Sequence, residues 1–258
     1  MDTPVYDTIK TRELQVQNEI RKRRLESLHK LPIIPNGYKN LIENTLSSFD
    51  STQIIQKFCI PITVKDLKTL RSPNWLNDEV INFYFELICQ RSKEKSNYPR
   101  LHIFNTFFYH KLKSSGYDSI KRWTRKVDIF SYDIILIPIH LGIHWCCAEI
   151  NLKEKSIRYY DSLHNSNKTC LKLLLEYLIE EHKDKKATDG IAEFDSENWT
   201  LSSPKNIPCQ QNGYDCGVFA CIFAEYRSRE ADFTFSQKNM NYFRDKISYE
   251  IIKGALLL

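Results

Sequence analysis

The sequence has little of what marks fibrous, disulfide-stabilised or disordered chains. Its 258 residues include only 7 glycines and 9 prolines, and aromatic residues reach 12%. This composition excludes collagen-like repeats and general disorder. Hydrophobic residues at 42% and charged residues at 27% supply enough apolar material for one sizeable core and an appendage. We therefore expect an ordinary globular protein.

Long apolar runs and metal-binding cysteine patterns are also missing. No run approaches the roughly 20 residues of a membrane-spanning helix, and the first four residues lack the layout of a secretory signal. We expect an intracellular protein without membrane insertion, whose eight cysteines are reduced thiols. Their spacing gives neither two CxxC pairs nor a histidine–cysteine set suited to zinc, so the sequence predicts no metal site.

The charge is mildly basic and unevenly placed. A net charge of +5 is small for a dedicated nucleic-acid binder, so we expect no nucleic acid partner, but it favours an acidic protein partner. Residues 11–29 form a polar, basic stretch that favours a solvated or partner-bound helix. Its run Arg21-Lys22-Arg23-Arg24 resembles a nuclear targeting signal, although such runs are more often a solvated helix face.

The distribution of proline, glycine and apolar residues divides the chain into an extension and one main domain. Two prolines and a glycine in residues 31–37 oppose a helix there, and a dense apolar pattern begins near Phe58. We therefore expect residues 1–58 to be a basic N-terminal extension and linker, and residues 59–258 to be the main domain. Short β-branched runs predict strands at 133–139, 145–150 and 157–160, with a strand-like start to 102–108. Apolar spacing predicts helices at 77–88, 169–182 and 217–226, which together indicate an α+β fold.

The segment around Cys216 carries the clearest chemical signal. Gly213 and Gly217 permit tight backbone geometry on either side of Cys216, and an apolar helix begins there. A helix N-terminus favours the nucleophilic thiolate and stabilises a developing oxyanion. A random cysteine is more often a small core residue, but the flanking glycines and polar lead-in favour a nucleophile here.

A reactive thiol needs an imidazole base, and the base needs a group that orients it. His144 enters one predicted strand and Asp161 leaves the next, 17 residues later. Antiparallel pairing of these strands would place both side chains at one rim of the sheet. His140 is the nearest rival base, while the other histidines have no carboxylate so well placed and are expected to be structural.

Two further residues fit this site, each with a plainer alternative. Gln210 lies six residues before Cys216, where its amide N–H can face the carbonyl oxygen under attack; the alternative is a loop glutamine that satisfies the backbone. Trp145 directly follows His144 and suits a lid over a narrow substrate; the alternative is an ordinary core tryptophan.

These motifs resemble the Ulp/SENP family of cysteine proteases, which process the ubiquitin-like protein SUMO and remove it from conjugates. The resemblance runs from about Ile62 to Leu257, and within the family it is greatest to the nuclear SUMO proteases of animals. It rests on the segments 74–79, 104–108, 121–124, 138–145, 159–162 and 211–217. The main domain would then be a catalytic protease domain with a papain-like fold, permuted catalytic order and a central, mostly antiparallel sheet flanked by helices.

The resemblance also implies roles for individual residues. The catalytic set would be His144, Asp161, Gln210 and Cys216, with no metal and no organic cofactor. Trp75 and Trp145 would close over the glycine pair at the SUMO C-terminus, and Asp78, Phe107 and Arg122 match positions that contact the body of SUMO. One local departure is Cys209, where the family often has glutamine.

The implied protein is a nuclear, monomeric isopeptidase and endopeptidase that acts on SUMO and SUMO-conjugated proteins. Two alternatives stay open. One is the same thiol chemistry directed at another ubiquitin-like modifier, with Nedd8 the leading case. The other is a SUMO-binding module without catalysis, which the intact set of four catalytic residues disfavours.

Overall fold

The computed structural model describes residue 12 and residues 31–186 and 194–257. Residues 34–256 form one compact unit. The helix expected at residues 11–29 lies outside the described residues except for Arg12. Residues 31–37 contain no helix, in agreement with their two prolines and one glycine. The division of the chain at residue 58 stays a prediction.

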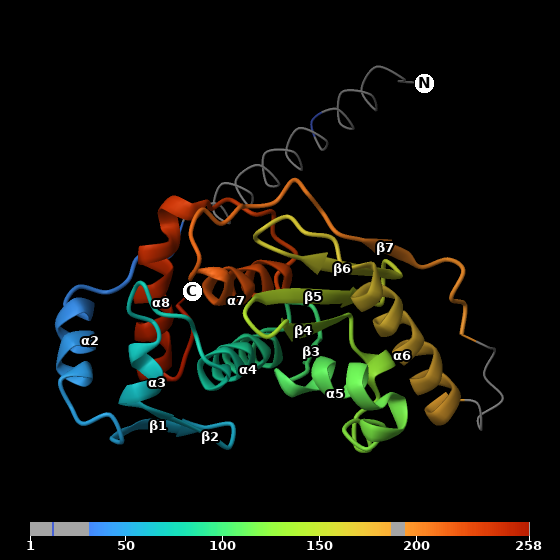
Figure 1. Cartoon of the computed structure of the whole chain (residues 1–258), viewed down its shortest axis with the longest axis horizontal. Helices are drawn as coiled ribbons and strands as arrows, with labels where there is room; N and C mark the ends of the chain where they lie inside the picture. The colour runs from blue at the N-terminus through green and yellow to red at the C-terminus, as the bar shows by residue number, and fades with distance from the viewer. Residues whose placement is uncertain (1–11, 13–30, 187–193, 258) are drawn as a thin grey trace, which may run out of the picture. The chain divides into compact units, whose positions relative to one another are not determined.

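Helices and short strands alternate irregularly along this unit (Figure 1). Within the described residues the order is α2 (Tyr38–Leu46), β1 (Gln53–Lys57), β2 (Ile60–Thr63), α3 (Val64–Lys68), α4 (Asp78–Glu94), β3 (Leu101–Ile103), α5 (Phe107–Ser115), β4 (Ile134–His140), β5 (Trp145–Asn151), β6 (Ser156–Tyr160), α6 (Lys168–Lys186), β7 (Thr200–Ser202), α7 (Cys216–Arg227) and α8 (Met240–Lys253). None of the helices in the described part of the chain has the length and apolar character to cross a membrane.

The central sheet has five strands in the order β3-β4-β5-β6-β7. Its three middle strands β4, β5 and β6, which the β-branched sequence runs predicted as strands, pair antiparallel. The edge strands pair in parallel with their neighbours, β3 with β4 and β7 with β6. Each has three residues, which are too few to show a hydrophobic period in the sequence. The stretch expected to be strand-like from residue 102 leaves the sheet after Ile103, and α5 begins at Phe107.

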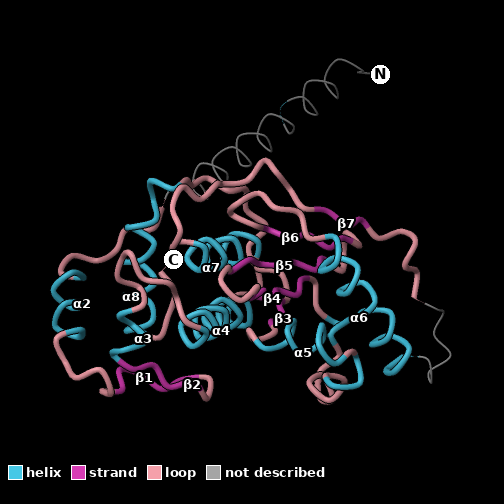
Figure 2. The backbone as a smooth tube through the Cα atoms, in the orientation of Figure 1, coloured by secondary structure: helices cyan, strands magenta, loops and turns pink. Residues whose placement is uncertain are grey.

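Helices cover both faces of this sheet (Figure 2). One face belongs to a core shared with α5 and α6, to which β5 contributes Cys146, Ala148 and Ile150. Trp145 and Glu149, which alternate with these residues along β5, meet α7 instead, because neighbouring residues of a strand point to opposite faces. This layered arrangement confirms the predicted α+β class.

Side-chain hydrogen bonds to backbone N–H groups mark where α4 and α7 begin. Asn77 caps α4, since its side-chain oxygen accepts the N–H of Val80 at 3.1 Å. Asn212 holds the turn before α7 by accepting the N–H groups of Tyr214 and Asp215, each at 3.1 Å. Every residue of α7 except Arg227 is buried, so α7 is a core helix whose first residue is Cys216.

Candidate active site

Strands β5 and β6 bring together a histidine and a carboxylate from different parts of the chain. His144 immediately precedes β5, and Asp161 immediately follows β6. The antiparallel register pairs Cys147 with Tyr160, so the start of β5 lies beside the end of β6. His144 Nε2 and Asp161 Oδ1 lie 2.6 Å apart. The predicted meeting of these two residues at one rim of the sheet is therefore observed.

The surroundings of this pair favour its charged form. Asp161 Oδ1 also accepts the backbone N–H of Leu163 at 2.8 Å. Burial alone would raise the pKa of Asp161, but the bonds from His144 and Leu163 outweigh it and hold that pKa below its usual value. Burial would likewise lower the pKa of His144, yet hydrogen bonds with Asp161, Cys146 and Cys216 raise it to about 12. The imidazole therefore favours its protonated form beside the Asp161 carboxylate.

Cys216 is the first residue of α7 and is buried, with 2% of its surface exposed. Its thiol lies close enough to His144 to raise the pKa of the imidazole, so His144 stands between Asp161 and Cys216. The first N–H groups of an α-helix have no partners within the helix, so they are available to a negatively charged group at this end. The arrangement is a thiol, an imidazole and a carboxylate in sequence.

Gln210 is held beside this group in one orientation. The Ser162 hydroxyl donates to Gln210 Oε1 at 2.9 Å, and the backbone N–H of Gln210 donates to Ser162 O at 2.8 Å. Gln210 Nε2 donates to the carbonyl of Asn212, within the turn that leads to Cys216. Since an amide nitrogen carries two hydrogens, one remains for another acceptor.

The two predicted lid tryptophans differ in exposure. Trp145 is buried, donates from Nε1 to Leu76 O at 3.1 Å, and stacks on His140 with the ring centres 4.1 Å apart. Trp75, directly before Leu76, leaves 49% of its surface exposed. Trp145 thus fixes the backbone next to Trp75, and Trp75 presents its indole outward.

The predicted surface residues lie around this site in different ways. Asp78 begins α4, and its charge acts on His140, whose pKa is nevertheless lowered because burial dominates. Phe107 begins α5 with 58% of its surface exposed, and Arg122 is also exposed. Nothing in the described part of the chain joins Phe107 or Arg122 to Cys216, so their roles stay predictions.

Some residues near the site carry no signal that sequence reasoning used. Ser162 ends the segment 159–162 that carries the family resemblance, and its hydroxyl orients Gln210. Cys146 lies beside His144 and accepts the Tyr159 hydroxyl at 2.9 Å, while burial raises the pKa of its thiol. Arg244 lies 28 residues after Cys216, and its side chain donates to Asp215, the residue directly before Cys216. Only the fold brings these side chains to the site.

One cluster has the composition of a metal site. The ligand atoms of His144, Cys146 and Asp161 lie within 4.8 Å of one another, and no other such group occurs among the described residues. Two ligands of one tetrahedral zinc, at about 2.0–2.1 Å from it, stand well over 3 Å apart. The 2.6 Å between His144 and Asp161 is a hydrogen-bond distance. We therefore assign the cluster to proton chemistry, and the absence of a cofactor stays a prediction.

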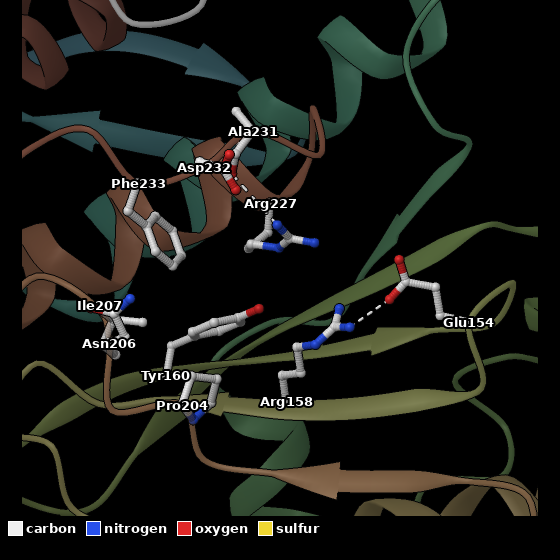
Figure 3. A pocket seen from close by; sticks show the side chains of 10 residues that line it. All are labelled: Glu154, Arg158, Tyr160, Pro204, Asn206, Ile207, Arg227, Ala231, Asp232 and Phe233. Carbon is white, nitrogen blue, oxygen red and sulfur yellow. Dashed lines mark hydrogen bonds and ion pairs between the residues drawn. The ribbon is translucent and has the colours of Figure 1, made fainter. Parts of the chain in front are cut away.

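A hollow of about 490 Å³ is lined by Tyr160, Phe233 and two arginines, and contains none of the four candidate catalytic residues (Figure 3). Arg158 donates to Glu154 at 2.5 Å, and Arg227 donates to Glu149 at 2.8 Å. Because carboxylates already neutralise both guanidinium groups, we assign this hollow no role in the chemistry.

Comparisons with known proteins agree with the site. The model of the Ulp1 protease family, C-terminal catalytic domain, matches residues 74–256. A sentrin-specific protease of Caenorhabditis elegans is 46% identical over 97% of this chain and 36% of its own length. Human sentrin-specific protease 2 is 41% identical over 96% of this chain and 41% of its own length. The chain thus spans well under half the length of these relatives.

A solved structure shares the fold. The C-terminal Ulp1 protease domain in complex with Smt3, the yeast ortholog of SUMO, superposes with a TM-score of 0.75 at 33% identity. The match covers 86% of this chain and 97% of that domain.

Removing the charge of Asp161 should lower the pKa of His144. In Asp161→Asn the amide no longer stabilises the imidazolium, so the pKa should fall from about 12 toward the ordinary histidine value near 6.5. An NMR titration of the imidazole measures this directly. Asp118→Asn, which alters an exposed carboxylate paired with Lys121, is the control and should leave the titration unchanged. An unaltered pKa in Asp161→Asn would show that another group supports His144.

The close approach of α7 to residue 76 should make Gly217 intolerant of a side chain. A Cβ on Gly217 would lie 2.8 Å from the Leu76 Cβ and 3.4 Å from the Trp145 indole. Gly217→Ala should therefore lower the free energy of unfolding by about 1–3 kcal/mol, as measured by urea denaturation. Gly213→Ala is the matched control, since its Cβ would meet nothing within 4 Å. Equal stabilities of the two variants would contradict this packing.

Proposed function

Because the chain belongs to the Ulp1 protease family, the family that its motifs resemble, we propose that it is a thiol isopeptidase and endopeptidase specific for SUMO. It removes SUMO from conjugated lysines and trims SUMO precursors after the C-terminal Gly-Gly. The observation that carries the proposal is the 2.6 Å contact of His144 with Asp161 beside Cys216 at the start of α7. The complex of the related Ulp1 domain with Smt3 supports the choice of substrate.

The first half of the reaction forms a thioester. The Cys216 thiolate attacks the carbonyl carbon of the terminal glycine, and the oxygen becomes an oxyanion. The free N–H of Gln210 and the N–H groups at the start of α7 stabilise that oxyanion. As the carbon–nitrogen bond breaks, His144 gives its proton to the leaving amine, which is the lysine Nζ of a conjugate or the α-amine of a precursor tail.

The second half restores the enzyme. Neutral His144 takes a proton from a water molecule, and the resulting hydroxide attacks the thioester carbonyl. The carbon–sulfur bond breaks, the new carboxyl group of SUMO leaves and loses its proton to solvent, and the thiolate is again paired with the imidazolium. Asp161 keeps the imidazole in one orientation and stabilises its charge through both halves.

Recognition divides into a channel and a surface. Trp145 and Trp75 flank the path of the glycine pair to Cys216, and a flat ring above an extended backbone excludes side chains. Asp78, Phe107 and Arg122 contact the body of SUMO, and the net charge of +5 speeds its approach. We propose that the protein acts as a monomer in the nucleus and needs no nucleic acid, as its family resemblance and the basic run at residues 21–24 suggest.

Covalent capture tests the proposal. SUMO carrying a C-terminal electrophile should label the protein with one SUMO per chain, while matched ubiquitin and Nedd8 probes should not react. Cys216→Ala should lose labelling and cleavage but keep SUMO binding, because a broad surface supplies most of the affinity. If the Nedd8 probe labels the protein in preference to the SUMO probe, the substrate of this thiol chemistry is Nedd8. If the native protein binds SUMO but no probe labels it, the protein is a SUMO-binding module without catalysis.

Selection of glycine by the channel gives a second test. A methyl group on either glycine must displace Trp145 or shift the scissile carbonyl, and a shift of about 1 Å costs roughly a hundredfold in rate. Trp145→Ala should slow cleavage of Gly-Gly precursors and narrow the difference between Gly-Gly and Ala-Gly precursors. The measurement is the ratio of their kcat/KM values in both proteins. If the ratio is the same in wild type and variant, Trp145 is an ordinary core residue.

A further inference from the structure

A buried arginine outside every recognised motif joins two parts of the site. Arg244 lies in α8, and its side chain and that of Asp215 each leave 3% of their surface exposed. Its Nε and Nη2 atoms donate to Asp215 Oδ1 at 2.9 and 2.7 Å. Because Asp215 directly precedes Cys216, this ion pair anchors the start of the nucleophile helix.

The same guanidinium group also binds three backbone carbonyls. Nη1 donates to Thr69 O at 3.3 Å, and Nη2 donates to Asn74 O at 3.0 Å and to Tyr214 O at 3.1 Å. Asn74 directly precedes Trp75. One planar side chain therefore holds the turn before Cys216 and the segment that carries the exposed tryptophan.

Residues 74–77, here called the strap, are fixed at their other end as well. Leu76 O accepts the Trp145 indole N–H at 3.1 Å, and Asn77 donates to Asp66 Oδ1 at 2.8 Å. The carbonyls on both sides of Trp75 are thus held, while the Trp75 side chain is half exposed. The indole is free to meet a substrate, and its backbone is tied to the rest of the site.

We propose that Arg244 is a positioning residue for substrate selection, which sets the spacing between the Trp75 strap and Cys216. This inference rests on the proposed function, since it concerns the channel for the Gly-Gly tail. The planar guanidinium suits the task because its five N–H donors point in fixed directions and reach carbonyls on two segments at once. A lysine ammonium would keep the charge beside Asp215 but is a compact point donor that cannot span both.

Arg244→Lys is therefore the informative change. It should retain the ion pair with Asp215 and free the strap, so hydrogen exchange in residues 70–77 should rise about tenfold or more. Cleavage of Gly-Gly precursors should fall about tenfold in kcat/KM, since small displacements of the channel are costly. The preference for Gly-Gly over Ala-Gly should shrink, while alkylation of Cys216 by iodoacetamide stays within about twofold of wild type.

The chain offers a matched control in Arg91. It is also a buried arginine, and it donates to Glu225 at 2.6 Å and to Ser228 Oγ at 2.6 Å. It lies 13 residues after the start of α4, which is about 20 Å from the strap along the helix. Arg91→Lys should reduce stability in the same manner but leave both the exchange of residues 70–77 and the Gly-Gly preference unchanged.

The outcomes separate the inference from the proposed function. Unchanged exchange in residues 70–77 of Arg244→Lys, or an equal change in Arg91→Lys, would overturn the inference. So would a loss of Cys216 alkylation as large as the loss of cleavage, because Arg244 would then act on the nucleophile. Should Arg244→Lys fail to fold, the charge-balanced pair Arg244→Gln with Asp215→Asn repeats the exchange measurement. Exchange needs no substrate, so it remains decisive even if the SUMO probe fails to label the wild-type protein.

Discussion

The antiparallel pairing of β5 with β6 is the constraint on which the site depends. His144 and Asp161 are 17 residues apart in the sequence, and this pairing brings their side chains to 2.6 Å from each other. Helix α7 then packs on β5 through Trp145 and Glu149, which sets Cys216 beside the imidazole. A shift of this pairing by one residue would turn every side chain to the other face and separate the three groups.

Close packing of backbone supports this geometry. Gly217 lets α7 approach Leu76 so closely that no side chain fits between them. Arg244 and the Trp145 indole hold the carbonyls on either side of Trp75. The buried ion pair of Arg244 with Asp215 adds little net stability, because desolvation offsets much of the attraction between the two charges. The value of both side chains here is directional, since a guanidinium and an indole N–H fix where a backbone segment lies.

The elements that the sequence predicted share a physical property. The middle strands and α4, α6 and α7 are long or strongly apolar, so their period shows without tertiary information. The edge strands β3 and β7 have three residues each, and α2, which lies in the stretch expected to be extension and linker, was not anticipated. Such elements are stabilised by the side chains they pack against, and a local window of sequence carries little information about those packing partners.

The sequence by itself determined the chemistry of this protein: a thiol at a helix start, an imidazole and a carboxylate at strand ends, and a glutamine near the thiol. Residue type and local spacing suffice for these, because a helix terminus and a strand end are local features. Only the tertiary structure decided which side chains orient them, namely Ser162 on Gln210 and Arg244 on Asp215 and the Trp75 strap. Such contacts join residues from 29 to 170 positions apart, and their partners are set by how helices pack on the sheet rather than by any local pattern.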